Sequence, residues 1–412
     1  MRIVSGSEAS EMIERIAARG QQVGASENAA QDIVNEVRQN GDSALRGFAE
    51  KWDELCPQQP MRVSKQELAD AGRALTTPLR RSISQSAENI RRFCELQKPR
   101  SWSRTRAGIT LGQIIKPLET VGCYIPGGRY PLLSTVLMTV IPAQVAGVKQ
   151  IRVVSPHPSQ EVLGVAAMLG VREFYRIGGA QAIAALAYGT ETISRVDKIV
   201  GPGNAYVTAA KRLVAFDCAI DFLAGPTEAV ILSDRGTPEF IASDLIAQAE
   251  HDVEALAFFI TTSRKLAKSV LQAVESLAQG NPTAQASLQK GAVFLAASKA
   301  QAREWANRVA PEHITVDEEY AAFIQNAGSI FVGDFSAQAA GDYASGPNHV
   351  LPTAGQARFR GGLSVLDFVK TISLQKLSRR GLQSIAPAIE CLATAEGLHG
   401  HADSIRVRRA NA

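Results

Sequence analysis

The sequence has few cysteines and no long uninterrupted hydrophobic run. Its 412 residues include five cysteines, which lie far apart and form no C-x-x-C pair. This pattern argues against a disulfide framework and a thiolate zinc site, and it favours reduced thiols in the cytoplasm. The most apolar stretch, residues 132–148, is interrupted by Pro142 and Gln144, and residues 1–20 interleave apolar with charged side chains. Neither a membrane span nor a signal peptide is therefore expected.

An excess of charge of one sign is also missing. The formal net charge is +4, from 44 Lys plus Arg and 40 Asp plus Glu, and the two signs are interspersed. This balance argues against a nucleic-acid partner. Hydrophobic residues make up 45% and charged residues 20%, which is close to average globular usage and excludes disorder, collagen and coiled coil as the main architecture. The length predicts two or three domains.

From Val121 onward, short β-branched segments alternate with Ala-rich helical ones. Strands are expected at residues 151–155, 174–177, 199–200, 229–233, 257–261, 292–295 and 329–332. This rhythm predicts an α/β fold with open, mostly parallel sheets, and its recurrence hints at a duplication. Neither a G-x-G-x-x-G turn nor a Walker A loop is present, so the usual nucleotide fingerprints are absent.

The two ends of the chain do not follow this alternation of strands and helices. The first hundred residues are expected to be helical, with N-caps at Ser7 and Ser26 and a capping box formed by Ser64 with Glu67. Residues 102–115 are strand-like. The tail from Ser364 is predicted to be helical and to dock on another surface, with a frayed basic tail as the alternative.

Five of the six histidines fall in four short polar motifs; the sixth, His157, is given no role. Gln248 and His251 lie three residues apart at a helix end, where they share a face and can offer two ligands to one metal. The alternative is an ordinary helix C-terminus, which favours histidine. Glu312 and His313 precede Ile314 at the mouth of a strand, where α/β active sites lie, and suit a general-base pair. A solvated Glu-His pair is the alternative.

Two further motifs are dense in ligand-type side chains. Residues 341–349 hold Asp342, a candidate metal ligand, and His349, a candidate substrate contact, in a loop rich in turn residues. Residues 396–401 hold His399 and His401, either of which suits a metal. Together these motifs supply only nitrogen and oxygen ligands, which is typical of catalytic rather than structural zinc. Structural turns are the alternative for both motifs.

Glycine-rich segments precede three expected helices, at residues 122–128, 178–181 and 201–204. Each places backbone N–H groups at a helix N-terminus, which suits a pyrophosphate. Three such turns in one segment favour a nucleotide site.

Taken together, these motifs resemble the histidinol dehydrogenases, the zinc- and NAD-dependent enzymes of the last steps of histidine synthesis. The resemblance runs from about Ser26 to Arg408 and is densest at the motifs above. It implies one Zn²⁺ per subunit and NAD as cofactors, and two Rossmann-like domains without the glycine fingerprint. A helical N-terminal arm and a C-terminal dimerisation tail complete the expected fold.

The resemblance also implies roles for individual residues. The metal ligands would be Gln248, His251, Asp342 and His401, and the catalytic pair Glu312 and His313. The NAD contacts would be Tyr124, Gln181 and Asn204. The substrate contacts would be Thr227, Gln248, His251, His313, Asp342, His349, Glu396 and His401. His313 would take the hydroxyl proton, and Glu312 would activate the water that attacks the aldehyde, in two successive oxidations.

Domain boundaries follow from the same resemblance. Residues 1–20 would form the arm, and 21–123 with 228–363 the first Rossmann-like domain, which carries the zinc and catalytic residues. Residues 124–227 would form the NAD-binding domain, and 364–412 a tail exchanged between the subunits of a homodimer.

The substrate stays open at this stage. L-Histidinol is the first expectation, but the short segment from Gly128 to Leu133, with Arg129 in it, is more like paralogues that oxidise other polar alcohols such as sulfopropanediol. A metal-dependent hydrolase and a non-catalytic zinc protein are the alternatives from other classes.

Overall fold

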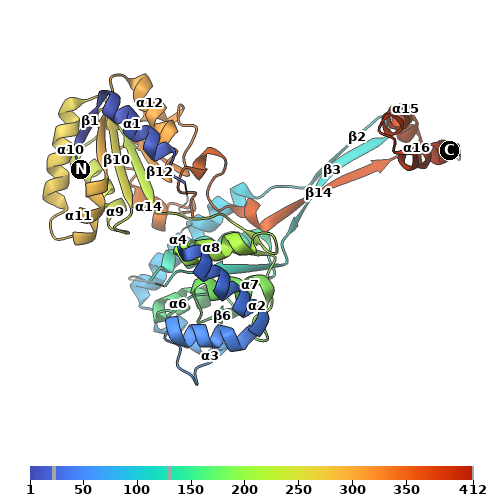
Figure 1. Cartoon of the computed structure of the whole chain (residues 1–412), viewed down its shortest axis with the longest axis horizontal. Helices are drawn as coiled ribbons and strands as arrows, with labels where there is room; N and C mark the ends of the chain where they lie inside the picture. The colour runs from blue at the N-terminus through green and yellow to red at the C-terminus, as the bar shows by residue number, and fades with distance from the viewer. Residues whose placement is uncertain (21–24, 128–130, 411–412) are drawn as a thin grey trace. The chain divides into compact units, whose positions relative to one another are not determined.

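The computed structural model describes residues 1–20, 25–127 and 131–410 and divides the chain into two compact units (Figure 1). The first unit comprises Met1–Gln97 and Glu119–Phe368, and the second comprises Lys98–Leu118 and Val369–Ala412. Within the described ranges, no helix is long and apolar enough to span a membrane.

The first unit contains two parallel sheets, the larger of which has six strands. Their order is β1 (Ile3–Ser5), β11 (Ala292–Leu295), β10 (Leu256–Thr261), β9 (Glu228–Leu232), β12 (His313–Val316) and β13 (Ser329–Val332). All five residues of β9 are buried, as expected for a central parallel strand that is covered on both faces.

Helices cover both faces of this larger sheet. On one face, α1 (Gly6–Ala17) and α12 (Lys299–Val309) pack their apolar sides on Val230, Phe258 and Phe294. On the other, α9 (Pro238–Ala249), α10 (Arg264–Leu277) and α11 (Pro282–Lys290) pack on Ile231 and Phe259.

The smaller sheet has five parallel strands. Their order is β6 (Glu173–Tyr175), β5 (Gln150–Val154), β4 (Thr120–Tyr124), β7 (Lys198–Val200) and β8 (Ala219–Ile220). It forms a core with α2 (Ala25–Trp52), α7 (Gly179–Tyr188) and α8 (Ala205–Val214), while α5 (Leu133–Ala146) contacts β4 and α6 (Gln160–Met168).

The two sheets share one topology. Apart from β1, each has its strands in the order third, second, first, fourth, fifth along the chain, which is the doubly wound order without its sixth strand. The predicted α/β class with parallel sheets is therefore confirmed, and the duplication suggested by the sequence is visible in the topology.

The N-terminal segments are placed differently from the prediction. Residues 1–17 are not a separate arm, because β1 pairs with β11 and α1 packs on α12. The helices α2, α3 (Lys65–Ala74) and α4 (Thr77–Gln97) contact α7, α6 and α5 of the smaller sheet, whereas the predicted boundaries grouped residues 21–123 with 228–363. An amphipathic pattern identifies the buried face of a helix but not the surface that covers it.

The predicted caps are confirmed in one place and wrong in two. Ser64 and Glu67 form the expected capping box at the start of α3. The N-cap of α1 is Ser5 rather than Ser7, and Ser26 lies inside α2, which begins at Ala25.

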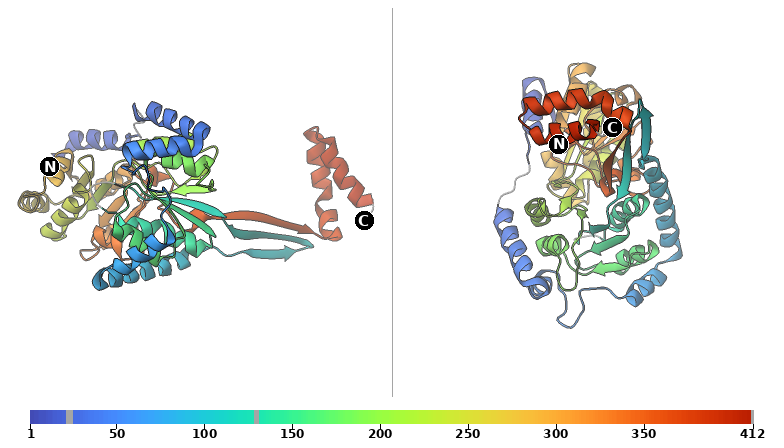
Figure 2. Two further views of the ribbon diagram at one scale, coloured as in Figure 1. Left: turned by 90° about the horizontal axis from the view of Figure 1, so that it is seen from below. Right: turned by 90° about the vertical axis from the view of Figure 1, so that its right-hand side faces the viewer.

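The second unit is an antiparallel ribbon with a helical hairpin (Figure 2). Its ribbon consists of β14 (Val369–Leu377), β3 (Ile109–Pro117) and β2 (Trp102–Arg106), and α15 (Arg379–Ala395) packs on α16 (His399–Ala410). The strand-like reading of residues 102–115 is confirmed. The wholly helical tail is wrong, because all nine residues of β14 pair with β3.

Candidate active site

Polar side chains gather at the amino edge of the larger sheet. Thr227 directly precedes β9, Glu312 directly precedes β12, and α9 returns to this edge and ends beside Gln248. As expected, the Glu312–His313 pair lies at the start of a strand, since His313 is the first residue of β12. The pair therefore lies at the amino edge of the sheet, opposite the carboxyl edge where α/β sites usually lie.

A chain of hydrogen bonds links Glu312 to α9. The Thr227 hydroxyl donates to Oε2 of Glu312, and the same oxygen accepts the backbone N–H of Glu228 at 3.1 Å. The Nε2 of Gln248 in turn donates to Thr227 Oγ1 at 2.5 Å. With its N–H group directed at Thr227, Gln248 has its amide oxygen free to act as a ligand.

His313 lies between two carboxylates. Its Nδ1 is 3.9 Å from Glu312 Oε2, and its Nε2 is 3.5 Å from Oδ1 of Asp342 on α14 (Gln338–Tyr343). The backbone that leads into this pair is irregular, since Ala310 at the end of α12 has a φ of 50° in the left-handed region. Within the described residues, the buried Nδ1 of His313 has no hydrogen-bond partner.

His349 joins the same group. Its Nδ1 lies 2.8 Å from the backbone oxygen of Asp342, and its Nε2 lies 3.4 Å from Oγ1 of Thr135 on α5. Nearby, the Asn348 side chain donates to the Met138 carbonyl, also on α5, at 2.6 Å. The helix that follows β4 in the smaller sheet therefore contacts the polar cluster of the larger sheet.

Burial and neighbouring charges together set the protonation of this cluster. Desolvation raises the pKa of Glu312 to about 7, although His313, Thr227 and the Glu228 N–H oppose the shift. Burial alone would lower the pKa of His313, but the charge of Glu312 and the contact with Asp342 raise it above its usual value. Burial lowers the pKa of His349, which favours the neutral imidazole.

The predicted metal ligands come together only in part. Gln248 lies on α9, His251 follows two residues after that helix, and Asp342 lies on α14. His251 is close enough to Asp342 to help lower the pKa of that carboxyl. Among the described side chains, no group of three His, Cys, Asp or Glu is close enough to hold a metal. These three residues supply an oxygen and nitrogen donor set of the kind that catalytic zinc uses.

Glu396 and His401 belong to the second unit. Glu396 is the C-cap of α15, and His399 and His401 lie in the first turn of α16. The segment from Gly128 to Tyr130, which includes Arg129, lies outside the described residues.

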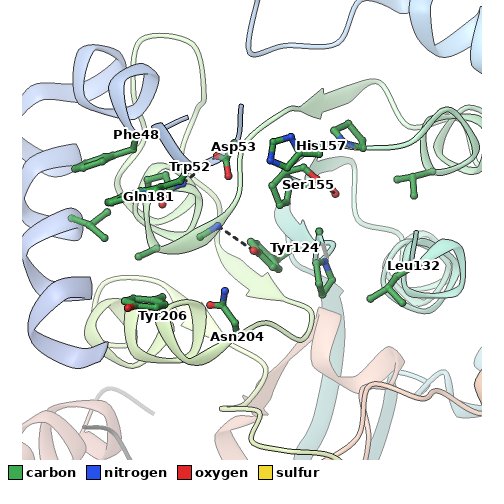
Figure 3. Close-up of a pocket in the computed structure, with 18 of the residues that line it drawn as sticks. Phe48, Trp52, Asp53, Tyr124, Leu132, Ser155, His157, Gln181, Asn204 and Tyr206 are labelled. Carbon is green, nitrogen blue, oxygen red and sulfur yellow. Dashed lines mark hydrogen bonds between the residues drawn. The ribbon is translucent and has the colours of Figure 1, made fainter. Parts of the chain in front are cut away.

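The smaller sheet carries a separate cavity of about 860 Å³ at its carboxyl edge. Tyr124 at the end of β4, Gln181 in α7 and Asn204 before α8 all line it, as Figure 3 shows. This is the edge where open parallel sheets bind nucleotides. The three predicted NAD contacts are therefore brought together.

Sequence reasoning missed several residues that line this cavity. Phe48 and Trp52 of α2 stack with ring centroids 4.9 Å apart, Asp53 follows them, and His157 lies on the turn after β5 (Figure 3). The position of His157 was foreseeable, because residues 151–155 were expected to be a strand whose carboxyl end precedes it. No local signal marks Asp53, which approaches Gln181 from a distant part of the sequence.

Comparison with known proteins gives one consistent result. Residues 17–409 match the family model described as histidinol dehydrogenase. The chain is 44% identical over 393 residues to the histidinol dehydrogenase of Methanothermobacter thermautotrophicus and 46% identical over 393 residues to that of Geobacillus kaustophilus, covering 92% of both chains in each case. The crystal structure of histidinol dehydrogenase from Elizabethkingia anophelis superposes with a TM-score of 0.95 at 36% identity, covering 100% of this chain and 98% of that one. The chain therefore belongs to the histidinol dehydrogenase family.

Proposed function

We propose that the chain is an NAD-dependent dehydrogenase that oxidises L-histidinol through the aldehyde to L-histidine. Family membership supports the activity. The observation that carries the proposal is the contact between Thr135 of α5 and His349. It links the two sites because α5 starts beside the cavity at Leu132, and His349 contacts Asp342, the neighbour of His313. A cofactor in the cavity would thus have one end near the titratable cluster.

The direction of NAD in the cavity follows from this contact. Leu132, at the start of α5, lines the cavity one turn before Thr135, whereas Phe48 and Trp52 line it from α2. The nicotinamide, which exchanges a hydride with the substrate, belongs at the Leu132 end. The adenosine belongs at the α2 end, where the stacked aromatic pair offers a surface for a base.

We propose that zinc is held by the Gln248 amide oxygen, His251, Asp342 and His401. Two observations support this assignment. The Gln248 nitrogen donates to Thr227, which leaves the amide oxygen to bind a metal, and all the donors are nitrogen or oxygen atoms. A bound Zn²⁺ would orient the substrate and polarise its oxygen. Gln248, His251 and Asp342 would supply three ligands from the first unit, and His401 in the first turn of α16 would be the fourth.

The chain's own residues divide the proton transfers. His313 accepts the hydroxyl proton at the unpartnered Nδ1 as the hydride leaves. Glu312, which is buried and has a raised pKa, activates the water that attacks the aldehyde. Thr227 and the Glu228 N–H fix one oxygen of Glu312, so its other oxygen is the one that faces the water.

We assign the remaining substrate contacts by their position in or near the polar cluster around Glu312 and His313. Thr227 and His349 lie within the cluster, alongside the ligands Gln248, His251 and Asp342 and the base His313. Glu396 and His401 would complete it from the tail. We propose a homodimer in which the tail is exchanged, so that these two residues come from the partner subunit, and we expect the enzyme in the cytoplasm.

A panel of alcohols tests the substrate. With Zn²⁺ and NAD⁺ present, NADH absorbance should rise fastest with L-histidinol and much more slowly with sulfopropanediol and simple vicinal diols. A preference for sulfopropanediol would indicate the paralogue's activity. Absence of NADH with every alcohol, together with cleavage of an ester or amide, would favour the hydrolase alternative.

A further inference from the structure

Asp53 is a buried acid that the proposed mechanism does not use. It directly follows α2, is only 6% exposed and lines the cavity of the smaller sheet. Among the described residues, no lysine or arginine forms an ion pair with it. A buried carboxylate without a cationic partner is costly, so its retention calls for a specific reason.

Two side-chain hydrogen bonds of Asp53 end on the loop and helix that border the cavity. Its Oδ2 accepts the backbone N–H of Gly178 at 2.9 Å and the Nε2 of Gln181 at 3.1 Å. Gln181 is itself 2% exposed. A primary amide has its donors on nitrogen and its acceptor on oxygen. Because the nitrogen of Gln181 donates to Asp53, its oxygen is the atom left for another partner.

The free end of Gln181 is its carbonyl oxygen, which lies over Gly179. A Cβ built on Gly179 would approach Gln181 Oε1 to 2.5 Å, and Gly179 has a φ of +58°. Glycine at this position thus leaves room for the amide oxygen beside the cavity. Were the amide reversed, its N–H group would face Gly179 and the Asp53 bond would be lost.

The other two predicted NAD contacts present donors instead. The Tyr124 hydroxyl accepts the Gly179 N–H at 3.1 Å, which leaves its own proton to donate. The Oδ1 of Asn204 accepts the Val207 N–H at 3.1 Å, which leaves its Nδ2 to donate. Gln181 is therefore the acceptor among the three, and it suits a ligand group that donates, such as a ribose hydroxyl.

We propose that Asp53 is a positioning residue for the cofactor, which holds the Gln181 amide with its oxygen toward the cavity so that it accepts a hydrogen bond from a hydroxyl of NAD. The proposal rests on the NAD-dependent function above. A purely structural role, in which Asp53 only holds the N–H of Gly178 at the start of α7, is the alternative.

A double-mutant cycle on NAD⁺ affinity separates the two roles. Asp53→Ala should weaken NAD⁺ binding, measured by calorimetry, about tenfold, while kcat at saturating NAD⁺ stays close to that of the parent. Gln181→Met, which keeps the length but removes the amide, should weaken binding to a similar degree. Adding Asp53→Ala to Gln181→Met should change the affinity less than twofold, because the two act as one unit.

Two controls accompany the cycle. Asp53→Asn retains an acceptor oxygen and should recover most of the affinity lost in Asp53→Ala. Asp70→Ala removes an exposed acid on α3 that bonds Arg73 outside the cavity, and it should leave NAD⁺ affinity unchanged. Thermal unfolding of each variant reports the structural effect separately.

The outcomes are distinct. Wild-type affinity in folded Asp53→Ala, or full additivity with Gln181→Met, would overturn the positioning role. If Asp53→Ala does not fold, Gln181→Met and Asp53→Asn carry the test, and wild-type affinity in the former overturns the proposal. Failure of the wild-type protein to bind NAD⁺ would instead overturn the proposed function.

Discussion

Burial is the main influence on the protonation of Glu312. The side chain lies beside the equally buried His313 and accepts bonds from Thr227 and Glu228. A carboxyl that titrates near neutral pH can hold a proton at low pH and act as a base above it. Oxidation of the aldehyde should therefore increase as the pH rises through about 7.

Glu312→Gln tests this assignment through stability as well as activity. Since the pKa of Glu312 is raised to about 7, the folded wild type keeps a proton between the ordinary pKa of 4.5 and about 7. The associated stability is present at low pH and is lost as the pH rises through that window. In metal-free protein, the melting temperature of Glu312→Gln relative to wild type should thus rise across this range and level off above it.

The matched control is Glu239→Gln, an exposed acid in the first turn of α9. Its melting temperature should follow that of wild type at every pH. A constant difference between Glu312→Gln and wild type would contradict the raised pKa. Glu312→Gln should also stop the reaction at the aldehyde level, as measured by NADH formed from the aldehyde.

At the residue scale, short motifs predicted the cluster better than they predicted the cavity. Glu312, His313, Asp342 and His349 stood in dense polar motifs, and the structure brings them together. Asp53 gave no such signal, because its partners Gly178 and Gln181 lie more than a hundred residues away in the sequence. Long-range side-chain contacts of this kind depend on the packing of α2.

Among the elements, the loop from Gly201 to Asn204 depends on a buried ion pair. Lys211 on α8 donates to Asp221 and to the backbone oxygens of Gly201 and Phe222, and Asp221 accepts the Gly201 N–H at 2.7 Å. Gly201 has a φ of +117°, and a Cβ there would meet the Tyr124 carbonyl at 2.1 Å. The pair thus fixes the turn that leads to Asn204.

Removal of one member of this pair should be strongly destabilising. Lys211→Met would leave Asp221 charged and without its cation, at a cost of about 3–5 kcal/mol in the free energy of unfolding measured with denaturant. The exposed pair of Lys290 with Glu254 provides the control, since Lys290→Met should cost less than about 1 kcal/mol. Equal effects in the two variants would contradict the role of the buried pair.

The strands were predictable from the sequence, whereas the placement of helices was not. Ile151–Ser155 and Ala257–Thr261 were expected as strands and correspond to β5 and β10 within one residue, because central parallel strands are continuously apolar. Glu312 and His313 were expected just ahead of a strand and lie there, but sequence patterns do not show where helix α9 ends relative to them. β14 was missed because its partner β3 lies more than two hundred residues away.

For the whole molecule, the proposed exchange of tails predicts complementation between two defective variants. His251→Ala and His401→Ala should each lose zinc and activity, since each lacks one ligand. Refolding of an equal mixture should pair them at random, so that about half of the dimers are hybrids and each hybrid has one intact site. Zinc content and activity should then return to about a quarter of the wild-type values.

The control for this experiment is His399→Ala, which should retain zinc and activity because this histidine is assigned no role. If the mixture of His251→Ala and His401→Ala stayed inactive while dimers formed, each tail would contribute His401 to the site of its own subunit. If His401→Ala alone kept its zinc, the ligand assignment itself would be wrong.

The yield of NADH from a limiting amount of L-histidinol tests the central claim most directly. With Zn²⁺ and an excess of NAD⁺, two successive oxidations should give two NADH for each L-histidinol consumed, with L-histidine as the product. A yield of one NADH would mean that the reaction ends at the aldehyde, and no NADH would contradict the assignment of the dehydrogenase activity.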